Sequence, residues 1–322
     1  MYNSEQKERF IKQYTTSEGN RKFCYSMFQL TEKSELEYGK DVCCFDKNEA
    51  TKLLESVAGI RKSVKASRVA VLRKYVRWCV DNDMPGASGD LLLVKVTGIE
   101  NIQKKMLSNP RMLEQRLHSL FDEGQSDYEI EYNINNIYKA YYWLAYMGVP
   151  ENEILEIRET DVDFAYMMIR CNGLNYPLYP ESVPVFKSCM LPKFLYVHTN
   201  YVSELDWRCD GDVLLRGFNK VNSVMSMRST LSRIAKKRID NGKEEIRLSY
   251  VRVYLSGIFF RKYQSEISGY EVDFRNEAIE LVATRDKNRG IEPDKEYEIR
   301  IQHANREYLD DYHRWKIAFG LI

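Results

Sequence analysis

The sequence feature that most constrains the fold is an aromatic-rich stretch between Tyr132 and Met147. Tyrosine, isoleucine and leucine side chains are spread around most of the circumference that a helix would have here. A helix that is apolar on nearly all sides must be largely buried. Gly148 is expected to end this helix. The chain must therefore fold around at least one buried helix.

The length and composition predict a protein of two domains. A chain of 322 residues is longer than one hydrophobic core usually organises. Its 44% hydrophobic residues can fill two cores, and its 30% charged residues are typical of a globular protein. No apolar run approaches the roughly 18 residues of a membrane span, and the mixed polar start lacks the plan of a secretory signal. We therefore expect a cytoplasmic protein with no membrane partner.

Cysteine and histidine spacing gives no sign of a disulfide framework or a metal site. The seven cysteines include no CxxC pair. The four histidines are dispersed and form no HExxH motif. We expect reduced thiols, no metal and no cofactor.

The periodicity along the chain predicts a mainly α fold with a small antiparallel β-sheet. Residues up to about 120 read as helices, one of them running from near Ser63 towards Asp81. The polar segment Asp122–Asp127 is the expected linker between domains over residues 1–122 and 128–322. The second domain is expected to contain strands from Val162 to Arg170 and, after a turn at Asn172-Gly173, up to Val185, then helices over roughly 191–201, 221–239, 251–266 and 296–319.

The net charge of +1 conceals two strongly basic segments. From Arg61 to Arg77 there are seven basic residues and no acid, and from Arg228 to Arg238 there are five and no acid. On the first of these helices an apolar face lies nearly opposite the cations and consists of Val64, Val71, Leu72, Tyr75 and Cys79. An ordinary solvated surface is the alternative, but such surfaces normally mix both signs. The segments favour contact with a polyphosphate.

The part of the second domain from Tyr142 to Ile157 carries a resemblance to a known family. It ends a helix at Gly148, places Glu153 shortly after, and is followed by Asp161-Val162-Asp163. This frame resembles the tyrosine recombinases, or phage integrases, in which Gly-Leu-Arg-x-x-Glu-Leu ends a helix and Asp-Ile-Asp precedes a hairpin. The resemblance implies a two-domain architecture, with a helical SAM-like core-binding domain and a catalytic-like domain.

The same resemblance implies that catalytic positions have been lost. Family members attack DNA with a tyrosine, and two arginines stabilise the charge that develops on the phosphate. The first arginine position is Pro150, and the His-x-x-Arg box reads Ser249 to Arg252, so only its arginine remains. No lysine lies between Arg170 and Lys187, where the hairpin general acid is expected. Removal of one charged donor from such a site typically costs about a thousandfold in rate.

The candidate nucleophile is ambiguous. His303 and Tyr312 have a spacing similar to that of the family's last His or Trp and its tyrosine. Tyr312 also belongs to an apolar stripe with Tyr308, Trp315 and Phe319, a pattern more typical of packing. We therefore expect no catalytic residues, with Arg252, His303 and Tyr312 as relics of family positions.

We expect a sequence-specific double-stranded DNA-binding protein that does not cut DNA. The first and last segments are similar to the recombinase-fold repressors of SPβ-type temperate phages, which implies a repressor that maintains a prophage in lysogeny at the host nucleoid. An active recombinase is the alternative, and a helical protein without a DNA role is a third interpretation. A second copy or a regulatory protein partner is left open. The residues expected to contact DNA are Lys62, Lys65, Arg68, Arg73, Arg77, Arg228, Arg233, Lys236, Lys237, Arg247 and Arg252.

Overall fold

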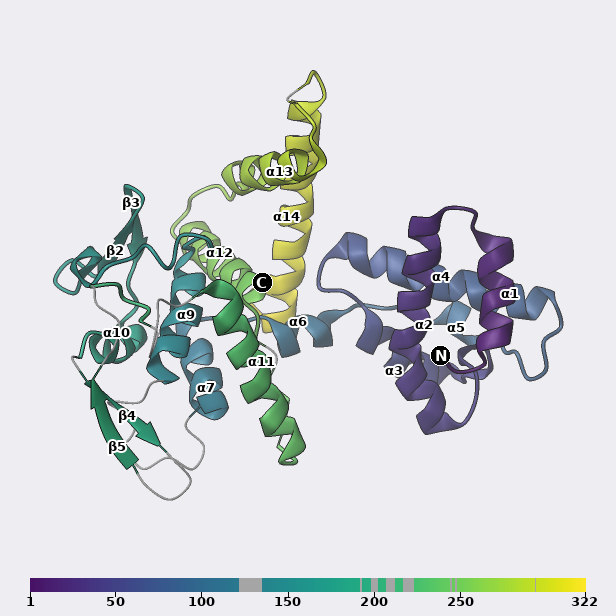
Figure 1. Ribbon diagram of the computed structural model, residues 1–322. Helices are drawn as coiled ribbons and strands as arrows, with labels where there is room; N and C mark the ends of the chain where they lie inside the picture. Colours follow the sequence, from purple (N-terminus) through teal and green to yellow (C-terminus); the bar gives the residue numbers. More distant parts are fainter. Residues whose placement is uncertain are drawn as a thin grey trace. The chain divides into compact units, whose positions relative to one another are not determined.

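The computed structural model describes residues 1–121, 135–191, 212–216, 223–243, 245–246, 248–292 and 294–322, together with the backbone of 193–197 and 202–206. The predicted fold class, mainly α with a small antiparallel β-sheet, is confirmed by the order of elements (Figure 1). Contacts divide the chain into a first unit of Met1–Lys104 with Asp273–Ile322 and a second unit of Lys105–Val272. This grouping differs from the predicted domains, because α14 packs against α4. The predicted linker Asp122–Asp127 lies outside the described residues.

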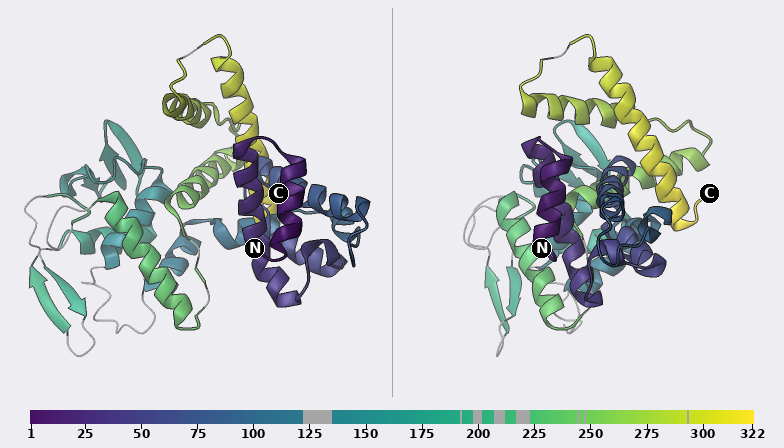
Figure 2. Two further views of the ribbon diagram at one scale, coloured as in Figure 1. Left: turned by 45° about the vertical axis from the view of Figure 1, so that its right-hand side comes forward. Right: turned by 90° about the vertical axis from the view of Figure 1, so that its right-hand side faces the viewer.

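The first unit is helical throughout its described residues. Its N-terminal part and the C-terminal hairpin, in which α13 lies across α14 (Figures 1 and 2), share one compact unit. The elements are α1 (Ser4–Tyr14), α2 (Glu18–Tyr38), η1 (Val42–Cys44), α3 (Lys47–Val57), α4 (Lys62–Asp81), α5 (Asp90–Leu93), α6 (Ile99–Lys105, whose last residue begins the second unit), α13 (Arg275–Arg289) and α14 (Tyr297–Phe319).

A buried ion pair lies at the centre of the first unit. Lys7 on α1 and Glu35 on α2 are both fully buried, and Lys7 Nζ lies 2.6 and 2.5 Å from the two carboxylate oxygens. Glu35 also accepts hydrogen bonds from the Thr31 hydroxyl and from the backbone N–H of Val42 in η1. These bonds satisfy a charge that would otherwise be costly in an apolar interior. The aromatic core of Phe10, Phe28 and Tyr75 packs beside it.

The second unit surrounds the predicted buried helix. All residues of α9 except Asn135 and Tyr138 are buried. The longer neighbour α12 crosses it closely at Gly257, where an added Cβ would lie 1.8 Å from the carbonyl oxygen of Tyr146. Only glycine permits this approach. The elements are α7 (Pro110–Phe121), α9 (Asn135–Met147), η2 (Glu159–Asp161), β1 (Val162–Asp163), β2 (Met168–Cys171), β3 (Leu174–Pro177), η3 (Pro180–Ser182), α10 (Val183–Cys189), β4 (Lys193–Val197), β5 (Val202–Asp206), α11 (Val224–Asp240) and α12 (Tyr250–Ile267).

The small sheet has the antiparallel order β1-β2-β3, with Ile169 opposite Val162 on one side and Tyr176 on the other. The predicted turn at Asn172-Gly173 is confirmed, and both residues have the positive φ that a tight hairpin needs. The expected strand up to Val185 was wrong. Residues 180–189 are helical rather than a strand, because prolines stand at the first turns of η3 and α10.

The predicted helix over 191–201 was also wrong. Residues 193–197 and 202–206 instead form a second antiparallel hairpin, β4–β5. Its sequence is rich in aromatic and β-branched residues, which favour strands. The predicted helices over 221–239, 251–266 and 296–319 are confirmed as α11, α12 and α14.

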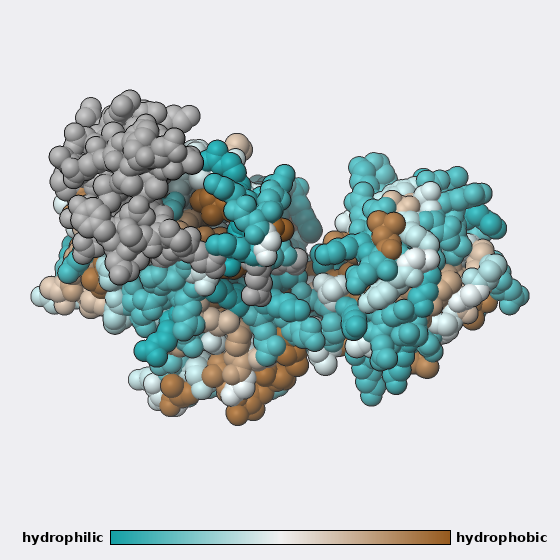
Figure 3. All heavy atoms as spheres, turned by 90° about the horizontal axis from the view of Figure 1, so that it is seen from below, coloured by the Kyte–Doolittle hydropathy of each residue, from teal (hydrophilic) through white to brown (hydrophobic). Residues whose placement is uncertain are grey.

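No helix among the described residues is long and apolar enough to cross a membrane. In the space-filling view from below, the surface of the described residues is mainly hydrophilic with separate apolar patches (Figure 3).

We predict that Lys7→Met lowers the free energy of unfolding by about 3–5 kcal/mol, because it leaves the Glu35 carboxylate buried without its cation. Urea unfolding monitored by circular dichroism measures this change. The double variant Lys7→Met/Glu35→Leu should recover much of the loss, since it removes both charges. An equal or larger loss in the double variant would show that the pair itself is not the determinant.

Candidate nucleic-acid interface

Helix α4 separates an apolar face from a basic one, as its sequence predicts. Its buried residues are Val69, Val71, Leu72, Tyr75, Val76 and Cys79. Val64, expected on the same face, is instead 37% exposed. It stands in the first turn of the helix, before α4 reaches the core of the unit. The remaining predicted face is confirmed.

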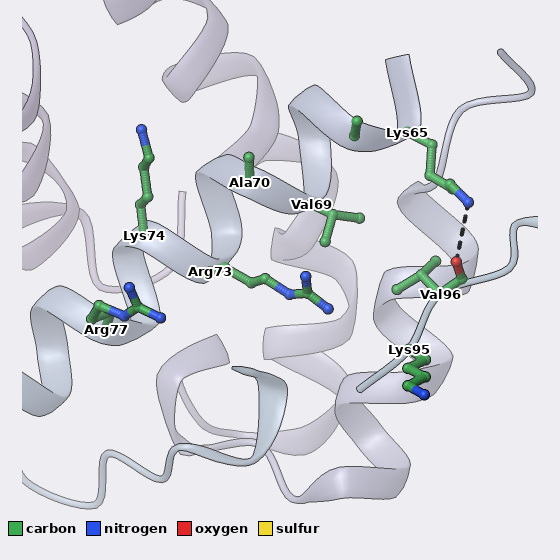
Figure 4. Close-up of a pocket in the computed structure, with 9 residues that line it drawn as sticks. Lys65, Val69, Ala70, Arg73, Lys74, Arg77, Lys95 and Val96 are labelled. Carbon is green, nitrogen blue, oxygen red and sulfur yellow. Dashed lines mark hydrogen bonds between the residues drawn. The ribbon is translucent and has the colours of Figure 1, made fainter. Parts of the chain in front are cut away.

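The basic face of α4 borders an open groove of about 550 Å³. Its other wall is the segment after α5 that carries Lys95 and Val96 (Figure 4). The lining contains five cations and no acid: Lys65, Ala66, Val69, Ala70, Arg73, Lys74, Arg77, Lys95 and Val96. We call this surface the basic groove. Lys74 and Lys95 were not among the residues predicted to bind DNA. Lys95 lies outside the acid-free segment of the sequence, so no local signal identifies it.

Two of the cations also hold the groove together. Arg73 donates to the carbonyl oxygen of Val94 at 2.5 Å, and Lys65 donates to that of Val96 at 3.2 Å. These bonds fix the segment beside α4 and limit the freedom of both side chains. Burial lowers the pKa of Lys65, and the nearby Arg314 adds to this effect. Arg77 and Lys95 are exposed and form no hydrogen bond or ion pair with other described residues. They are the cations most available to a phosphate.

In the folded protein, two acidic residues of α14 lie beside the first turn of α4. Asp310 of α14 pairs with the Lys62 ammonium at 2.8 Å. Asp311 accepts a hydrogen bond from the backbone N–H of Lys62 at 2.9 Å, so α14 caps the start of α4. Arg314 donates to the carbonyl oxygens of Ile60 and Thr97. Burial raises the pKa of Asp311. The interpretation of Lys62 as part of an uncompensated basic face is therefore corrected.

Arg68 is turned inward, and donates to the carbonyl oxygen of Val57.

The basic residues of α11 differ in their surroundings. Arg233, Lys236 and Lys237 are exposed and form no hydrogen bond or ion pair within the described part of the chain. Arg228 instead holds the Glu151 carboxylate, with its Nε 2.7 Å from Oε1, and the Tyr141 hydroxyl donates to the same carboxylate. The hydrogen bond between Arg228 and Glu151 raises the pKa of Arg228. Arg247 lies outside the described residues.

The family positions Ser249 and Arg252 line a pocket of about 570 Å³ in the second unit. Arg228 and three tyrosines, Tyr141, Tyr142 and Tyr250, line the same pocket. The Tyr250 hydroxyl donates to the carbonyl oxygen of Val149, which fixes the backbone next to Pro150. Arg228, the other arginine that lines this pocket, is paired with Glu151. No group of three or more His, Cys, Asp or Glu side chains in the described part of the chain could hold a metal ion.

The other two positions that the resemblance singled out belong to the first unit. His303 and Tyr312 lie on α14, with His303 exposed and Tyr312 only 3% exposed. The Tyr312 ring stacks on Trp315 and packs against Phe274, which in turn stacks on Tyr308. The predicted apolar stripe on this helix is confirmed, and it is a packing surface.

Two comparisons with known proteins found similar sequences or structures. Residues 1–81, from the start of the chain to the end of α4, match the family model described as MrpR, N-terminal core-binding domain. No curated protein matches the chain. A solved structure of the Tn1549 transposon integrase, residues 82–397, in complex with circular intermediate DNA, is 13% identical. That alignment covers 83% of this chain and 87% of the integrase chain, with a TM-score of 0.33.

We predict that Asp311→Ala lowers the free energy of unfolding of the protein by about 1–2 kcal/mol, because it removes the carboxylate that caps α4. The neighbouring Asp310→Ala is a matched control, since the exposed pair with Lys62 should contribute about 0–1 kcal/mol. Urea unfolding of both variants measures the difference. Equal effects would mean that the cap does not stabilise the start of α4.

Proposed function

We propose that this protein binds double-stranded DNA in a sequence-specific manner and acts as a phage transcriptional repressor that maintains lysogeny, with a recombinase-like fold that does not cut DNA. The observation that carries this proposal is the acid-free basic groove, whose α4 wall lies within the segment that matches a core-binding domain. Five cations along one groove suit the evenly spaced phosphates of a duplex. The exposed cations Arg233, Lys236 and Lys237 of α11 would add phosphate contacts from the second unit.

Three features support binding without cleavage. The family position of the first arginine is Pro150, which has no side-chain donor. Arg228 is engaged by Glu151, and Tyr312 is buried among aromatic rings. Arg252 remains in its pocket and can contact a phosphate without any chemistry. In this proposal the protein acts in the cytoplasm of a bacterial host, on DNA of the nucleoid.

We predict that Arg77→Ala/Lys95→Ala weakens duplex binding by about tenfold or more at 100 mM salt, because each loses a charge-assisted phosphate contact. The slope of log affinity against log salt should fall in magnitude by about 2. Fluorescence anisotropy titrations between 50 and 200 mM salt measure both quantities. Lys40→Ala/Lys104→Ala removes the same charge outside the groove, at lysines already paired with Glu49 and Glu100, and should change neither. Equal effects of the two double variants would reduce the groove to an ordinary solvated surface.

We predict that the protein forms no covalent adduct with a nicked duplex that traps phosphotyrosine intermediates, because Tyr312 is buried and the first arginine is absent. A denaturing gel with labelled DNA detects such an adduct. An adduct that disappears in Tyr312→Phe would favour the alternative, an active tyrosine recombinase.

A further inference from the structure

A second groove, of different chemistry, lies on the other side of α4. It has a volume of about 540 Å³ and no charged residue in its lining. Tyr14 and Phe23 form one part of it, and Val64 and Val71 of α4 form another. Phe23 and Val64 are each 37% exposed. We call this surface the apolar groove.

The two grooves are separated by a narrow ridge on α4. The ridge consists of four small, exposed residues, Ser63, Ala66, Ser67 and Ala70, which recur at helical spacing. Ala70 lines both grooves, so the apolar surface and the cations are directly adjacent. Side chains of this size allow the backbone of α4 to come close to whatever the ridge meets. A polyanion in the basic groove that extends across Ala70 would meet the ridge and then the apolar groove.

We propose that the ridge of α4 enters the major groove of DNA and that the apolar groove receives the C5 methyl groups of thymines. This inference rests on the proposed function and adds the part of the protein that distinguishes sequences. The thymine methyl is the one apolar group that base edges present in the major groove. Phosphates of the same duplex lie along the basic groove, where Arg77 and Lys95 contact them. Phosphate contacts fix the position of the helix, and contacts to methyl groups select A·T pairs.

The charge pattern favours DNA over a protein partner as the occupant of the apolar groove. A protein seated in the apolar groove would extend over Ala70 towards the five cations of the basic groove. The lining of that groove contains no acid that could neutralise them. A duplex meets both requirements at once, since its base edges and its phosphates lie side by side.

The test uses a duplex selected by the full-length protein from a random pool. A second version of that duplex carries deoxyuridine in place of thymidine, which removes only the methyl groups. The wild-type protein should bind the uracil version about fourfold more weakly for each methyl that it contacts, given about 0.8 kcal/mol per buried methylene-sized group. Phe23→Ala should weaken binding to the thymine duplex and abolish the difference between the two duplexes.

Matched variants keep this result interpretable. Tyr25→Ala, on the same helix as Phe23 but outside both grooves, should retain the full difference in affinity between the thymine and uracil duplexes. Val64→Ala, which widens the apolar groove from the α4 side, should reduce the difference between thymine and uracil. This variant replaces Phe23→Ala in the test if Phe23→Ala does not fold. Arg77→Ala should weaken both duplexes equally, because a phosphate contact is independent of the methyl group.

The possible outcomes separate the two proposals. A protein that binds no duplex would contradict the proposed function as well. Specific binding with equal affinity for both duplexes would leave the proposed function intact and refute the role of the apolar groove. A thymine preference that survives in both Phe23→Ala and Val64→Ala would place the methyl contact elsewhere and overturn the inference. A change of oligomeric state in Phe23→Ala, with no change in DNA binding, would identify the groove as a protein contact instead.

Discussion

The first unit depends on the buried ion pair between Lys7 and Glu35. Neither charge can be left alone in an apolar interior, so α1 and α2 must hold the positions in which the two groups meet. The Glu35 carboxylate also receives the N–H of Val42, and the neighbouring Asp41 accepts from the Tyr75 hydroxyl on α4. The pair thus fixes three helices and η1 through polar contacts of defined direction. As a consequence α4 keeps its apolar face inward and its cations and small residues outward.

The basic groove is a product of tertiary structure on top of this scaffold. Arg73 and Lys65 bind the carbonyl oxygens of residues 94 and 96, which brings Lys95 next to cations that lie about twenty residues earlier in the chain. Arg314 of α14 donates to the carbonyl oxygen of Ile60, which precedes α4 in the chain, and to that of Thr97, which follows it. Asp310 and Asp311 neutralise the first turn of the same helix. The cations of α4 that have no ion pair with a described acid therefore lie after Lys62.

Much of the fold could be predicted because helix signals are local. The buried α9, the amphipathic α4, the turn at Asn172-Gly173 and the helices α11, α12 and α14 follow from spacing and turn chemistry. The hairpin β4–β5 was mistaken for a helix, since short apolar runs fit either structure until their partner is known. Helix α13 was missed because few apolar residues mark its buried side, mainly Ala278 and Val282. Both errors concern elements whose state is settled by what they pack against.

The sequence by itself determined that the segment from Arg61 to Arg77 carries seven cations and no acid, that Pro150 stands where the tyrosine recombinases that the sequence resembles have an arginine, and that an aromatic stripe runs along residues 308–319. These are properties of residue identity and helical periodicity. Only the tertiary structure decided which charges remain available, because ion pairs join residues far apart in the chain. The Lys62 ammonium meets Asp310 across 248 positions, and Arg228 meets Glu151 across 77. Burial of Tyr312 against Phe274 was decided in the same way, by the packing of two helices rather than by the pattern of either one.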